Sequence, residues 1–127
     1  MRRLFRLALV MIIIFLGATL YGDDTFRPVS FEAITVDSTA GGKAFTVAKY
    51  FDVANSRVIA DSCIMVNETA QIRFTVDGTT VTSTVGTPLQ VNQGWILDSY
   101  EELKNFRAIA TGTTSGSLKV IFYKRYK

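Results

Sequence analysis

Histidine is absent from the 127 residues, and cysteine occurs only once, at Cys63. Without histidine, the chain can form neither a Ser-His-Asp nor a Cys-His catalytic pair, and it lacks the most common metal ligand. A lone cysteine excludes an intrachain disulfide. Because Cys63 lies within the apolar run 60–66, the sequence favours a small buried residue over a reactive thiol.

Acidic pairs and phosphate-binding motifs are equally scarce. The adjacent acidic pairs are Asp23-Asp24 and Glu101-Glu102, and neighbouring side chains do not face each other on a strand or on a helix. The fragment Gly41-Gly42-Lys43 lacks the spacing of a phosphate loop, and no run of carboxylates has calcium-loop spacing. We therefore expect a protein that is not an enzyme, with no catalytic residue, no cofactor and no metal.

The net charge of +3 does not belong to the folded part of the chain. Of the 14 lysines and arginines, Arg2, Arg3 and Arg6 lie in the first six residues, which leaves 11 basic residues against 11 acidic ones. The folded part is therefore neutral overall, and its local basic tail of Lys119, Lys124, Arg125 and Lys127 fits a solvated terminus better than a phosphate contact. No nucleic-acid partner is expected.

The first 22 residues have the three-part plan of a secretory signal peptide, with a basic head, an apolar run at 7–21 and then Gly22. That run of about 15 residues is shorter than the roughly 20 needed for a comfortable membrane span, although tilt or interfacial anchoring would close the gap. Residues 1–22 are expected to be either a cleaved signal peptide or a retained membrane anchor with a cytoplasmic N-terminus. A buried helix of a soluble protein is a third possibility.

After a short linker at 23–28, residues 29–127 are expected to form one domain. Its clearest strand pattern begins at Gln71, where Ile72, Phe74 and Val76 alternate with polar residues before a turn at Asp77-Gly78. Leu118, Val120 and Phe122 alternate in the same way, so the two sets are expected to supply the two layers of the core.

Further strands are expected at 29–36, 57–67, 89–97, 106–111 and 117–124, with an extended threonine-rich arm at 79–84 and a hairpin-like loop at 112–116. Gly94 indicates a bulge or a bend, and 44–51 fits either a strand or a helical turn. Ser99 and Glu102 have capping-box spacing, which predicts a short helix at 100–105. The whole pattern predicts an all-β, antiparallel β-sandwich of jelly-roll or immunoglobulin-like type, preceded by an N-terminal hydrophobic helix.

A few residues are candidates for ligand or interface contacts. Aromatic side chains can stack on sugars, and Trp95 is also a candidate for the core or a subunit interface. Two arginines lie on predicted strands, where they would either pair with Asp77 or Glu102 or point into solvent. The candidates are Trp95, Tyr100, Tyr123, Tyr126, Arg73 and Arg107.

The segments Ile72–Thr79, Phe106–Ile109 and Leu118–Tyr123, with Gly86 between them, resemble small β-sandwich virion proteins of tailed bacteriophages, of the accessory or decoration kind. The resemblance covers residues 31–124 and implies a non-enzymatic, oligomeric protein that binds other virion proteins. The N-terminal segment departs from it, because a phage head assembled in the cytoplasm has no use for an export signal. The departure suggests a membrane-containing virion, an envelope-attached phage product or a cellular protein that shares the fold.

The sequence therefore predicts a structural or interaction module that is exported or membrane-tethered, in a virion or a surface lattice. Its partners would be copies of itself or other virion or surface proteins, with the membrane reached through residues 1–22. The alternative from another class is a secreted carbohydrate-binding or adhesive β-sandwich domain.

Overall fold

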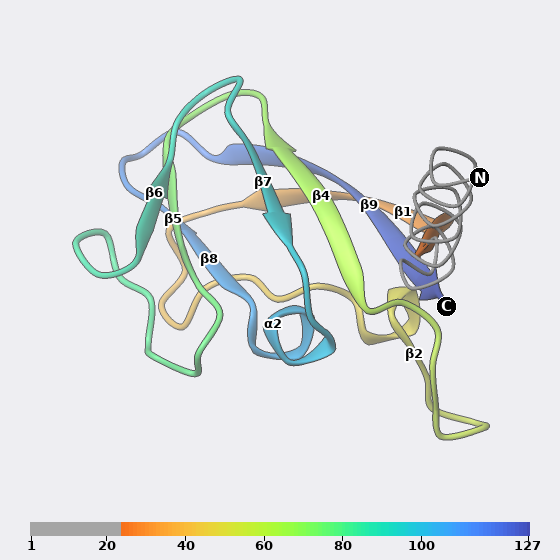
Figure 1. Cartoon of the computed structure of the whole chain (residues 1–127). Helices are drawn as coiled ribbons and strands as arrows, with labels where there is room; N and C mark the ends of the chain where they lie inside the picture. The colour runs from red at the N-terminus through yellow and green to blue at the C-terminus, as the bar shows by residue number, and fades with distance from the viewer. Residues whose placement is uncertain (1–23) are drawn as a thin grey trace, which may run out of the picture.

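The computed structural model describes residues 24–127, so the signal peptide or anchor expected at 1–22 lies outside the described residues. Strands dominate the described part (Figure 1). They are β1 (Thr25–Val36), β2 (Phe51–Asp52), β3 (Arg57–Val58), β4 (Ser62–Asn67), β5 (Ile72–Thr75), β6 (Thr87–Leu89), β7 (Gly94–Leu97), β8 (Arg107–Ala110) and β9 (Gly116–Tyr126). Two short helices, the 3₁₀ helix η1 (Val47–Lys49) and the α-helix α2 (Tyr100–Asn105), lie between strands.

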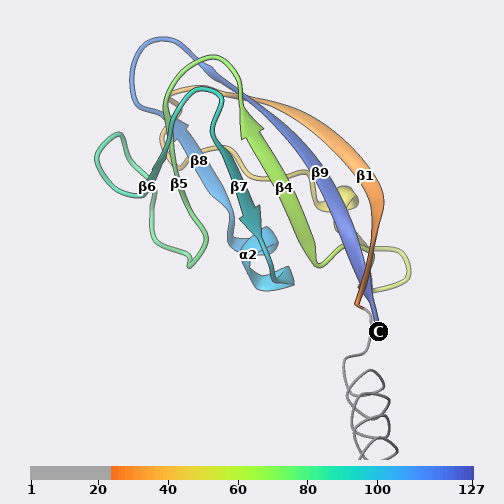
Figure 2. The ribbon, with the colours of Figure 1, turned by 45° about the horizontal axis from the view of Figure 1, so that its top comes forward.

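The strands form a four-stranded sheet in the order β1-β9-β4-β7, a three-stranded sheet in the order β6-β5-β8, and the small β2-β3 ribbon. All the pairings between these strands are antiparallel. After β4 the chain changes sheet at four connections, namely β4 to β5, β6 to β7, β7 to β8 and β8 to β9. Three of these crossings lie at one end of the molecule, and α2 makes the fourth at the opposite end (Figures 1 and 2).

The core lies between the two larger sheets, as the alternating patterns predicted. Ile72 and Phe74 of β5 are buried, and so are Leu118, Val120 and Phe122 of β9, while Val76 packs against this cluster partly buried. The fold is therefore all-β and β-sandwich-like, and this prediction is confirmed. Burial of these side chains supplies the main stabilising free energy.

Phe45 adds an unexpected member to the core. It lies in the irregular segment before η1, stacks on Phe106 with ring centroids 3.9 Å apart and meets the edge of Phe122 at 5.2 Å. The ambiguous segment 44–51 thus places an aromatic anchor between the sheets and then makes one helical turn.

The predicted helix is present with the expected bounds. The Ser99 hydroxyl accepts a hydrogen bond from the Glu102 backbone N–H at 3.2 Å, so the cap works as the spacing indicated. The Glu102 carboxylate accepts from the Asp98 N–H at 2.7 Å, one residue before the position of a standard capping box. Leu103 is the buried residue of the helix and joins the core.

Two strand predictions need correction at their boundaries. The strand expected at 57–67 is broken, because the N–H groups of Ile59 and Ala60 both bond to the Tyr50 carbonyl rather than to a neighbouring strand. Conversely, residues 25–28 of the expected linker already pair with β9, so β1 begins at Thr25.

The regions after β5 also differ from expectation. The arm at 79–84 is a loop, because the Thr82 hydroxyl accepts from the Val85 N–H at 2.9 Å and closes a local turn. The strand expected at 89–97 is divided between β6 and β7 in different sheets, and the positive φ of Asn92 makes the bend that was expected at Gly94. The loop at 112–116 crosses between sheets and so is not a hairpin.

Candidate interaction surface

A row of apolar side chains crosses the outer face of the four-stranded sheet, the face turned away from the three-stranded sheet. Phe31 lies opposite Ile121, Ile121 lies opposite Ile64, and Ile64 lies opposite Ile96. We call these four residues the outer row. Their exposed fractions are 54%, 40%, 42% and 64% in the order Phe31, Ile121, Ile64, Ile96. One residue from each strand therefore contributes an exposed apolar side chain.

The outer row follows from strand geometry. Successive side chains on a strand point to opposite faces, and Cys63, Met65, Val120 and Phe122 are fully buried on the inner face. The residues between them, Ile64 and Ile121, must then point outward. Strands that are apolar on both faces are typical of sheets covered on both sides, yet nothing within residues 24–127 covers this one.

More apolar surface adjoins the outer row. Val66 is 37% exposed beside it, and Phe26 is 48% exposed near the start of β1. A hollow of about 680 Å³ opens on this face, lined by Phe26, Ser62, Cys63, Ile64, Ile96, Asp98 and Tyr123. The Ser62 hydroxyl is buried there and has no hydrogen-bond partner among the described residues. A group that enters the hollow would meet mainly apolar side chains, the Ser62 hydroxyl, and Asp98 and Tyr123 at the wall.

Charged residues at the rim of this face are paired with each other. Lys119 approaches Glu68 at 3.7 Å, and Arg125 pairs with Asp98. Two cations thus face two anions, so these pairs leave no excess charge that would favour an anionic ligand.

The aromatic candidates do not gather into one binding face. Trp95 is 41% exposed and contacts Phe74 edge to face, with ring centroids 5.4 Å apart. Tyr100 instead packs near Tyr50, with ring centroids 6.0 Å apart. Tyr123 lines the hollow on the outer face. Tyr126 has the Arg27 guanidinium 5.2 Å from its ring centroid. Among residues 24–127, no ring contact joins any two of these four aromatic candidates.

Neither arginine forms an expected ion pair. Arg73 donates from Nε to the Ser83 carbonyl at 3.1 Å and from Nη1 to the Gly86 carbonyl at 2.7 Å, so it ties down the loop between β5 and β6. Arg107 donates to the Phe106 carbonyl at 2.7 Å. Both carboxylates that were expected as partners accept backbone hydrogen bonds instead, Asp77 from the Thr79 N–H and Glu102 from the Asp98 N–H.

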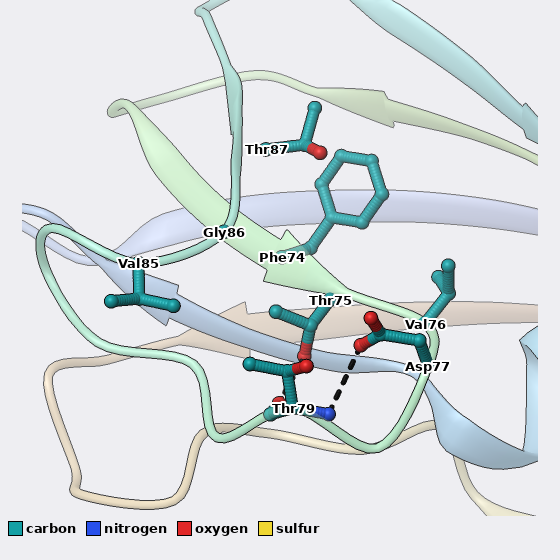
Figure 3. A pocket seen from close by; sticks show the side chains of 8 residues that line it. All are labelled: Phe74, Thr75, Val76, Asp77, Thr79, Val85, Gly86 and Thr87. Carbon is teal, nitrogen blue, oxygen red and sulfur yellow. Dashed lines mark hydrogen bonds between the residues drawn. The ribbon is translucent and has the colours of Figure 1, made fainter.

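That loop encloses a second, smaller hollow of about 280 Å³ (Figure 3). Its lining is Phe74, Thr75, Val76, Asp77, Thr79, Val85, Gly86 and Thr87, with one carboxylate among apolar groups and hydroxyls. The hydrogen bond from the Thr79 N–H lowers the pKa of the Asp77 carboxyl. Asp77 therefore holds the local turn, and among residues 24–127 it has no cation in ion-pair contact.

Other potentially reactive groups in the described part are shielded. Cys63 is fully buried, as predicted, and burial raises the pKa of its thiol to about 12. Within residues 24–127, no group of acidic or cysteine side chains is arranged to hold a metal ion. Asn67 of the sequon Asn67-Glu68-Thr69 is fully buried, with Nδ2 bonded to the Ala70 and Leu89 carbonyls, so its amide is not available to a sugar.

The fold and surface define a class: an all-β, sandwich-like protein with an apolar sheet face that nothing within residues 24–127 covers. Neither protein-family models nor curated proteins nor solved structures give a match to this chain. No helix in residues 24–127 is both long and apolar enough to cross a membrane.

The outer row itself was missed at the level of sequence. The sequence places Ile121 on the face opposite Leu118, Val120 and Phe122, but it does not place Phe31, Ile64 and Ile96 beside it, because a strand pattern does not say which face meets the second sheet. The available signal was that the strands at 29–36 and 57–67 carry apolar groups on both faces.

Proposed function

We propose that this protein is a non-enzymatic structural or interaction module that assembles through the outer face of its four-stranded sheet. Such a module fits an oligomeric virion or surface-lattice component that is exported, or tethered by residues 1–22. The observation that supports this proposal is the outer row, whose four exposed apolar side chains lie side by side across every strand of the sheet.

Two features support an interaction role over a catalytic one. The carboxylates of Glu68 and Asp98 at the edge of the outer face pair with Lys119 and Arg125, and Asp98 is the one carboxylate that lines the hollow. Exposed apolar patches rimmed by polar residues are typical of protein or membrane interaction sites. The sugar-binding alternative gains less support, because its aromatic candidates lie apart.

Size-exclusion chromatography with light scattering on residues 23–127 tests the proposal. Residues 24–127 enclose a core of their own between the two larger sheets, so this segment is expected to fold by itself. We expect either self-association that grows with concentration or retention on the envelope or virion fraction of the source. A strict monomer at high concentration that adheres to neither fraction would contradict the proposal.

A further inference from the structure

We propose that the occupant of the outer face is a second copy of this chain, packed sheet to sheet about a twofold axis. This inference rests on the proposed function and names the partner. In a twofold interface the same patch serves on both subunits, so the patch must complement itself. The outer row does so, because it lies across the middle of the face and contains only apolar side chains.

The rim charges favour a copy over a charged partner. Each basic rim residue, Lys119 or Arg125, already has an acidic neighbour at the edge of the face. A nucleic acid or an anionic lipid surface would need unpaired cations, which this rim does not supply. A second copy presents an equally neutral rim, so the two rims can meet without net charge repulsion.

The area of the outer face limits the expected affinity of the dimer. With strands about 4.8 Å apart, four strands span about 19 Å, and the six steps from Lys119 to Arg125 span about 20 Å. The projected area is therefore about 400 Å², and side-chain relief raises the accessible area above that. A standard interface buries about 800 Å² per partner, so this dimer is at the weak end, with a Kd roughly micromolar.

A weak dimer suits a tethered or lattice-bound protein. Chains held on one surface experience effective concentrations of about millimolar, which exceeds a micromolar Kd. Two sheets that pack face to face keep their strands within about 30° and interleave their side chains. Ile64 and Ile121, on the two central strands, would then lie nearest the twofold axis.

The test is sedimentation velocity, from about 1 to about 300 μM, on protein expressed from the full 127-residue sequence, in mild detergent if the N-terminal segment is retained. The variants Ile96→Lys and Phe31→Lys place a charge in the outer row on the two edge strands, where the side chains are 64% and 54% exposed and folding tolerates the change. Val53→Lys is the matched control, because Val53 is 69% exposed outside the four-stranded sheet. Unchanged thermal unfolding would show that each variant is folded.

We expect a concentration-dependent dimer whose Kd rises about tenfold or more in each outer-row variant and stays unchanged in Val53→Lys. Association that survives both outer-row variants would overturn the twofold sheet dimer but leave the proposed function standing. A monomer that still binds envelope or virion material through Ile96 would assign the face to another occupant. A monomer that binds neither would overturn both proposals. Dimerisation that appears only after residues 1–22 are removed would show that this segment covers the face, and would also overturn the inference for the intact chain.

Discussion

The buried side-chain amide of Asn67 joins the two large sheets, because its Nδ2 donates to the Leu89 carbonyl oxygen at 3.1 Å. Asn67 ends β4 in one sheet, and Leu89 ends β6 in the other. The same nitrogen also donates to the Ala70 carbonyl at 2.6 Å. One side chain thus satisfies one buried and one part-buried acceptor at the end of the sandwich where the chain crosses between sheets.

Replacement of Asn67 with alanine should therefore destabilise the fold. Asn67→Ala leaves the buried Leu89 carbonyl and the part-buried Ala70 carbonyl without this donor, and we expect the free energy of unfolding to fall by about 1–3 kcal/mol. Chemical denaturation followed by tryptophan fluorescence would measure the change. Asn55→Ala is the control, because Asn55 donates to Asp52 at an exposed turn and its loss should cost less than about 0.5 kcal/mol. Equal effects in the two variants would argue against the role of Asn67.

The aromatic anchor at Phe45 gives a second stability prediction. Phe45→Ala removes a ring that packs between Phe106 and Phe122, so we expect a loss of about 3–5 kcal/mol. Val47→Ala, two residues away at a 46% exposed position, should change stability by less than about 0.5 kcal/mol. Thermal unfolding of both variants tests this. A mild effect at Phe45 would mean that the segment before η1 packs more loosely than the structure shows.

The sequence predicted which residues form the core layers of the sandwich better than it predicted how the strands are connected and paired. Period-two alternation identified Ile72, Phe74 and Phe122 as core residues, because side-chain direction on a strand depends on local geometry alone. The division between β6 and β7 was not predictable in the same way. It depends on which distant strands accept the hydrogen bonds on either side of Asn92, and no local pattern contains that information.

The candidate surface also could not be predicted from local sequence patterns. Ile64 and Ile96 have the composition of core residues, and only the position of the second sheet decides that they face outward. Arg73 was recognised as a notable residue but was assigned the wrong partners. Its nearest acceptors are the Ser83 and Gly86 carbonyls of a folded loop, whose path the sequence did not predict.

Arg73 should control the order of the loop between β5 and β6. Arg73→Ala removes both hydrogen bonds to the loop carbonyls, so we expect a loss of about 1 kcal/mol and roughly fivefold faster amide exchange across 76–86. Hydrogen-exchange mass spectrometry resolves the segment. Arg107→Ala is the control, because Arg107 donates only to the carbonyl of the residue before it and should leave exchange in 76–86 unchanged. Uniformly faster exchange throughout the domain would instead indicate global destabilisation.

Three exposed aspartates should make stability depend on acid pH. Hydrogen bonds lower the pKa of Asp37 through the Thr39 hydroxyl and its N–H, of Asp52 through the Asn55 side chain, and of Asp77 through the Thr79 N–H. Because each pKa is lowered in the folded state, the stabilisation is present above the unfolded value near 3.8 and is lost as pH falls through the folded value. The triple variant with asparagine at all three positions should lose less stability than the wild type between about pH 5 and about pH 2. Identical acid profiles would contradict this assignment.

Cys63 should produce the opposite dependence at alkaline pH. Burial raises its pKa from 9.0 to about 12, so the stabilisation is complete below the unfolded pKa and is lost as pH rises through that interval. Urea denaturation at pH values from about 8 to about 11 should show a steeper decline for the wild type than for Cys63→Ala, by at most about 1.4 kcal/mol per pH unit. The slopes are compared rather than the absolute stabilities, because the alanine also loses packing in the core. Tyr50, whose pKa burial also raises, titrates in both proteins, so its effect cancels. Parallel declines would show that the Cys63 thiol does not ionise on unfolding in this pH range, or that water reaches it in the folded state.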